Sequence, residues 1–61
     1  MFYRGDIIRC VMPNGVLSLN RLYAVMGGGY EPTIINDLGY EANYRGERFE
    51  LVEPVSQCKR E

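Results

Sequence analysis

Hydrophobic and polar residues alternate along most of this chain with a period of two, the spacing that is typical of β-strands. The alternation predicts five short strands, over residues 6–11, 21–26, 31–37, 39–44 and 49–53. Helical spacing is not kept anywhere for more than about one turn. We therefore expect an all-β fold.

The same alternation predicts which side chains face the core. In the first strand Arg9 marks the solvent side, so Ile8 and Cys10 are expected to point inward. The second strand is apolar on both faces, which leaves its register open, and we place Tyr23 and Val25 inward.

Aromatic residues dominate the two later strands. Tyr40, Ala42 and Tyr44 share one face of the fourth strand, and we expect both tyrosines to pack in the core. In the last strand the pattern predicts that Phe49 and Leu51 point inward, with Glu50 and Val52 outward.

Turn-forming residues separate the predicted strands. A turn is expected at residues 12–15, after which residues 16–20 fold over one end of the core or form a single helical turn. The glycines at 27–29 are followed by neither Lys-Ser/Thr nor a helix, so they indicate a mobile loop rather than a phosphate-binding loop. A tight turn is predicted at residues 36–39 and a 3₁₀ turn at residues 45–48.

Four segments carry a resemblance to a known fold family. They read Gly5-Asp6-Ile7-Ile8-Arg9-Cys10, Leu19-Asn20-Arg21-Leu22-Tyr23-Ala24-Val25, Asp37-Leu38-Gly39 and Arg48-Phe49-Glu50-Leu51-Val52. In these segments and in its strand order the chain resembles small SH3-like proteins of tailed bacteriophages and prophages. The resemblance implies a five-stranded SH3-like barrel over residues 1–54, with a short 3₁₀ turn before the last strand and a polar C-terminal tail at 55–61.

The resemblance also implies an accessory protein without catalytic residues. Signalling SH3 domains bind proline-rich ligands with a Trp and an acidic loop after the first strand. This chain has no Trp, and residues 12–20 contain no acid. We therefore do not expect polyproline binding.

Composition narrows the chemistry further. The chain has 61 residues and no His, which excludes Ser-His-Asp triads and Cys-His dyads. Two cysteines cannot complete a tetrahedral zinc site. Glu47, Glu50 and Glu53 recur every third residue, but on a turn followed by a strand they do not converge. We predict a protein that is not an enzyme and that has no cofactor and no metal.

The redox state of the two cysteines, Cys10 and Cys58, depends on the cellular compartment. No apolar run approaches the ~20 residues of a membrane span, and the first residues do not resemble a signal peptide. We expect a cytoplasmic location, in a bacterial cell or a phage-infected host, with both thiols reduced. One disulfide between the two cysteines is the alternative.

Three functions remain, all of them based on binding. The first is docking on a host bacterial protein, because arginine and tyrosine favour interface hot spots. Its candidate residues are Arg21, Tyr30, Arg45 and Arg48. The second is nucleic-acid binding, which the net charge of −1 disfavours. Its candidate residues are Arg4, Arg9, Arg21, Arg45 and Arg48. The third is self-association into a homo-oligomer, through an exposed edge or the apolar second strand.

Overall fold

The computed structural model describes residues 1–55 and contains the predicted elements in the predicted order. They are β1 (Ile7–Cys10), β2 (Leu22–Ala24), β3 (Thr33–Ile35), β4 (Glu41–Asn43), the 3₁₀ turn η1 (Gly46–Arg48) and β5 (Phe49–Glu53). The all-β prediction is confirmed. Most strands are shorter than the alternation predicts, because their ends already belong to the connecting turns.

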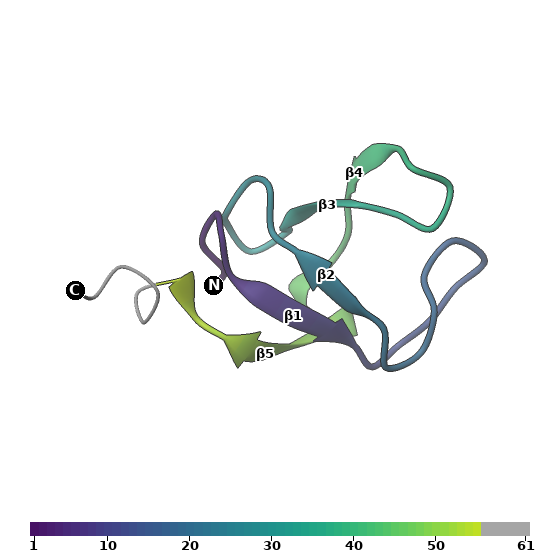
Figure 1. Ribbon diagram of the computed structural model, residues 1–61, viewed down its shortest axis with the longest axis horizontal. Coiled ribbons are helices and arrows are strands. Elements are labelled where there is room, and N and C mark those ends of the chain that lie inside the picture. The colour runs from purple at the N-terminus through teal and green to yellow at the C-terminus, as the bar shows by residue number, and fades with distance from the viewer. Residues whose placement is uncertain (56–61) are drawn as a thin grey trace.

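The first sheet places β1 in the centre, with β2 and β5 as antiparallel neighbours (Figure 1). Ile8 lies opposite Tyr23 on one side and opposite Leu51 on the other. The register shifts between Ile7 and Ile8, because Ile7 pairs with Glu53 and so leaves Val52 as an extra residue in β5. This β-bulge bends β5 at its C-terminal end.

The second sheet is the β3–β4 hairpin, and its turn is built as the sequence predicts. The Asn36 side-chain oxygen accepts hydrogen bonds from the backbone N–H groups of Leu38 (2.9 Å) and Tyr40 (3.1 Å). Gly39 has φ 90°, a conformation that favours glycine.

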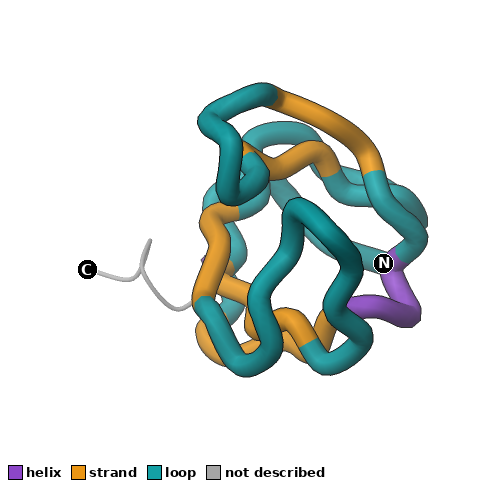
Figure 2. Tube along the Cα trace, turned by 90° about the vertical axis from the view of Figure 1, so that its right-hand side faces the viewer, coloured by secondary structure: helices purple, strands orange, loops and turns teal. Residues whose placement is uncertain are grey.

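The chain leaving β2 runs directly beside β3. The Met26 N–H donates to the Thr33 carbonyl (2.7 Å), and the Thr33 N–H donates to the Gly27 carbonyl (2.9 Å). Figure 2 shows the strands and loops winding around a common interior. The strand pairing forms two separate sheets, so closure into a barrel stays a prediction.

Seven hydrophobic side chains fill the interior between the sheets. They are Ile8, Cys10, Leu17, Tyr23, Val25, Ile34 and Phe49. The rings of Tyr23 and Phe49 meet edge to face, with centroids 6.2 Å apart. In the segment after β1, Leu17 is buried and Val16 packs against the core, as predicted, whereas Leu19 is 57% exposed. The inward placement of Tyr23 and Val25 is also confirmed.

One core prediction is wrong, and a second is right in direction but not in burial. Tyr40 is 68% exposed, because it ends the tight turn before β4 and projects beyond the core. Leu51 is 47% exposed although it faces buried Ile8 across the sheet. Around Leu51 the surface is open and is lined by N-terminal residues and by Pro54 and Val55. Tyr44 is partly buried and packs against the core, and its hydroxyl accepts a hydrogen bond from the Asn36 amide (3.1 Å).

The glycine-rich loop is hydrogen-bonded to the N-terminal segment. Phe2 and Gly29 exchange two backbone hydrogen bonds, of 3.0 and 2.8 Å. A Cβ atom on Gly28 would lie 2.6 Å from the Phe2 carbonyl oxygen. Glycine is therefore required at position 28 by a close approach of two backbones.

Candidate functional site

A buried carboxylate joins the two ends of the described chain. Asp6 is almost fully buried, and its Oδ2 accepts a hydrogen bond from the Tyr3 N–H (2.9 Å). Its Oδ1 accepts one from the Val55 N–H (2.7 Å), just beyond β5. Gly5, with φ 97°, provides the turn that brings Tyr3 back towards Asp6. Both side-chain oxygens accept hydrogen bonds, as buried polar atoms require, so Asp6 links the two segments structurally.

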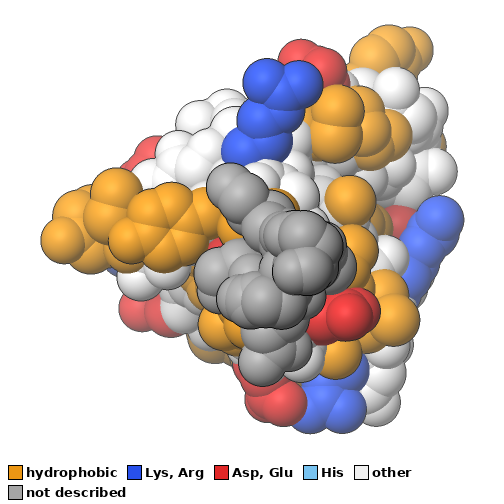
Figure 3. All heavy atoms as spheres, turned by 60° about the vertical axis from the view of Figure 1, so that its left-hand side comes forward, with side chains coloured by type: hydrophobic (Ala, Val, Ile, Leu, Met, Phe, Trp, Pro, Cys, Tyr) orange, Lys and Arg blue, Asp and Glu red, His pale blue; other side chains and the backbone are white. Residues whose placement is uncertain are grey.

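An open groove of about 500 Å³ lies between the segments that Asp6 joins. Its lining is mostly apolar and consists of Met1, Tyr3, Arg4, Asp6, Leu51, Pro54 and Val55. We call this the terminal groove. Met1 and Tyr3 are exposed, as Leu51 is. Figure 3 views this end of the molecule and shows apolar side chains gathered on it, some projecting well beyond the surface.

The concavity follows from the packing of the first sheet. Leu51 and Ile8 are cross-strand partners and so share the inner face of the sheet. Ile8 is covered by the core, whereas Leu51 lies in the open groove with N-terminal residues and with Pro54 and Val55. An exposed apolar concavity of this kind is typical of a binding surface.

The predicted arginines do not form a common basic patch. Arg9 pairs with Glu50 (2.6 Å) on the outer face of the first sheet, and Arg45 lies 3.9 Å from Glu47. Arg48 donates to the Met12 carbonyl (3.0 Å). Arg21 pairs with Asp37 (2.9 Å) near the tight turn. Arg4 alone among these candidates lines the terminal groove.

The four predicted partner-binding residues are only partly brought together. The Gly46 N–H donates to the Tyr30 carbonyl (3.0 Å), which places Tyr30 beside the turn that Arg45 precedes. Arg48 ends the same turn. Arg21 lies in another part of the molecule, because its side chain is held by Asp37.

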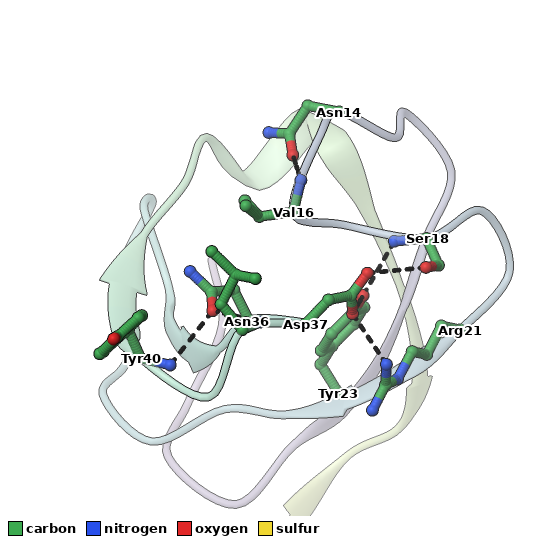
Figure 4. A network of polar contacts seen from close by, with 9 residues as sticks. Asn14, Val16, Ser18, Arg21, Tyr23, Asn36, Asp37 and Tyr40 are labelled. Atoms are coloured by element: carbon green, nitrogen blue, oxygen red, sulfur yellow. Dashed lines mark hydrogen bonds and ion pairs between the residues drawn. The ribbon is translucent and has the colours of Figure 1, made fainter.

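Asp37 gathers polar groups from three segments (Figure 4). It accepts hydrogen bonds from the Ser18 hydroxyl (2.7 Å), the Tyr23 hydroxyl (2.7 Å) and the Arg21 guanidinium (2.9 Å). The Tyr23 oxygen in turn accepts from the Ser18 N–H (3.0 Å). These bonds fasten the segment after β1 and the start of β2 to the β3–β4 turn.

The network shifts the pKa values of its two acids in opposite directions. The hydrogen bond from Ser18, followed by that from Tyr23, lowers the pKa of the Asp37 carboxyl below its usual value. Burial, reinforced by the nearby Asp37 charge, raises the pKa of the Tyr23 hydroxyl. Asp37 is thus held ionised and Tyr23 neutral. Because the polar groups of the network form hydrogen bonds with one another, we interpret the network as structural.

Comparisons with protein-family models, with curated proteins and with solved structures found no match to this chain. Function must therefore be argued from the site itself. Over residues 1–55 no helix is long and apolar enough to cross a membrane. Within the same range no three His, Cys, Asp or Glu side chains gather as a metal site would require.

The terminal groove was not predicted from the sequence, although one signal was available. Met1-Phe2-Tyr3 is an apolar run directly before the Gly5 turn, and we assigned it no place in the core. Cys58 and the tail at 56–61 lie outside the described residues, so their predicted states are not addressed by the structure.

Proposed function

We propose that this chain is a non-catalytic protein-binding module whose contact surface is the terminal groove. The observation that carries the proposal is Leu51, which stands on the inner face of the sheet yet remains 47% exposed in an apolar concavity. Completing the burial of such side chains is the main favourable term in protein association. Tyr3 adds an aromatic ring of the kind that anchors interfaces.

We further propose that the two sheets form an SH3-like barrel. Support comes from the strand order, from the 3₁₀ turn directly before β5, and from the hydrogen bond that links Met26 to Thr33 between the sheets. The sequence resemblance to phage and prophage proteins makes cytoplasmic proteins of a bacterial host the first partners to test.

The arrangement of charges favours a protein partner over nucleic acid. Non-specific nucleic-acid binding depends on several cations that neutralise phosphates together. Here Arg9, Arg21 and Arg45 each lie within ion-pair distance of an acid of the same chain. The net charge of −1 adds no general attraction for phosphate.

The proposal is tested by affinity capture from bacterial lysate, with and without nuclease treatment, followed by mass spectrometry. Wild-type chain is compared with Leu51→Asp and with Leu22→Asp. Leu22 is a matched control, because it is 54% exposed and lies opposite Arg9, on the outer face of the same sheet. We expect the wild type to capture a bacterial protein that remains bound after nuclease treatment. Leu22→Asp should still capture this protein, whereas Leu51→Asp should not.

A second groove variant guards against a folding defect in the first. Tyr3→Ser removes another exposed side chain, while the Tyr3 N–H that bonds to Asp6 belongs to the backbone and is kept. It should also lose the partner, with a far-ultraviolet circular dichroism spectrum like that of the wild type. Loss of the partner on nuclease treatment, or with Leu22→Asp and not Leu51→Asp, would contradict the proposal.

A further inference from the structure

We infer that the segment bound by the terminal groove carries a large apolar side chain next to a carboxylate. This inference rests on the proposed function and specifies the chemistry of the partner. The apolar lining of the groove accounts for the large apolar side chain of the bound segment. The carboxylate follows from the interactions of Arg4.

Arg4 is the cationic side chain among the described residues that line the groove. It is exposed, lines the groove directly before the Gly5 turn, and makes no ion pair or side-chain hydrogen bond with any residue in the range 1–55. The other arginines in that range, Arg9, Arg21, Arg45 and Arg48, all have such a partner. A guanidinium binds a carboxylate through two parallel N–H groups, and so selects it geometrically as well as by charge.

The two acids at or beside the groove, Asp6 and Glu53, make no ion pair with Arg4. The Asp6 oxygens both accept backbone hydrogen bonds, from Tyr3 and Val55. Glu53 pairs with Ile7, which places it on the outer face of the sheet with Glu50 and Arg9. Among residues 1–55, the groove therefore presents an apolar surface with one cationic side chain that makes no ion pair.

Other occupants fit this surface less well. Residues 56–61, Ser-Gln-Cys-Lys-Arg-Glu, contain no large apolar side chain, and their two cations outnumber their one acid. A second copy docked symmetrically through the groove would bring one Arg4 towards another, which is electrostatically unfavourable. A segment of a different protein, with an acid beside its apolar anchor, satisfies both features.

The test uses a yeast-displayed library of random seven-residue peptides, selected against the full chain. Wild type should enrich peptides with Leu, Ile, Met or Phe within two positions of Asp or Glu. Arg4→Glu should instead enrich Lys or Arg at that position. Arg45→Glu is the control, because Arg45 is an exposed arginine outside the groove, and it should keep the preference for acids. Arg4→Glu should weaken the best wild-type peptide at least about tenfold, as expected for loss of a charged hydrogen bond.

The outcomes separate this inference from the function on which it rests. If enriched peptides require Leu51 but bind Arg4→Glu as tightly as wild type, the acidic motif is wrong and the groove remains the binding surface. If the selected peptides bind Leu51→Asp unchanged, or if no peptide is enriched, both proposals fail. If light scattering shows a dimer of the wild type that Leu51→Asp dissociates, the groove belongs to a second copy and the inference is overturned.

Discussion

Phe49 and Leu51 lie on the same face of β5 and offer a direct test of where the core ends. Phe49 is buried and packs edge to face against Tyr23, whereas Leu51 is half exposed in the terminal groove. Truncation of a buried Phe to Ala costs about 3–5 kcal/mol, which includes the cavity left behind. Full burial of a Leu contributes about 1.5–3 kcal/mol, so truncation of one that is 47% exposed should cost about 1 kcal/mol.

The difference between these two destabilisations is large compared with the free energy of unfolding of the whole domain. The expected free energy of unfolding of a chain of 61 residues is about 3–9 kcal/mol. Phe49→Ala should therefore lose a large share of the free energy of unfolding and show a strongly lowered urea midpoint, whereas Leu51→Ala should unfold cooperatively at a slightly lower midpoint. Urea titrations followed by circular dichroism measure both. The reasoning is refuted if Leu51→Ala lowers the free energy of unfolding as much as Phe49→Ala, since Leu51 would then be a core residue.

Three further predictions follow from other parts of the structure. Gly28→Ala should destabilise the fold by about 1–3 kcal/mol through its clash with the Phe2 carbonyl, while Gly15→Ala, with open space around its Cβ, should be close to neutral in the same urea titration. Because the pKa of Asp37 is lowered in the folded state, ionised Asp37 contributes fully to the free energy of unfolding above the usual carboxyl pKa, and this contribution is lost as the pH falls below about 4. The free energy of unfolding of Asp37→Asn should therefore depend less steeply on acid pH than that of the wild type, and an unchanged curve would contradict the network. The Cys10 thiol is fully buried, so mass spectrometry should find it alkylated by iodoacetamide only in urea, and labelling of the native chain at Cys10 would contradict its place in the core.

Local patterns predicted the elements well because each element has a local cause. The alternation around Arg9 placed Ile8 and Cys10 correctly, and the Asn36 to Gly39 turn forms through hydrogen bonds within four residues. The pattern failed at Leu51 for a physical reason. Alternation shows which face of a strand a side chain occupies, but whether that face is covered depends on the position of the second sheet.

The site was less accessible to prediction than the fold. The Asp37 network joins Ser18 and Tyr23 to a turn 19 and 14 residues away, and no spacing rule connects positions so distant. The terminal groove likewise combines Tyr3 with Leu51 and Val55, from opposite ends of the described chain. The predicted arginines were chosen by residue type, and the structure shows most of them engaged in contacts within the chain.

The most direct test of the account is a nuclear magnetic resonance titration of the ¹⁵N-labelled chain with the peptide that the wild type enriches. The account predicts that the largest amide shifts fall at the terminal groove, on Tyr3, Arg4, Leu51 and Val55. Leu22, on the outer face, should move little. Shifts concentrated around Leu22, or at Tyr30 and Arg45 with the groove unchanged, would contradict the claim that the terminal groove is the binding surface.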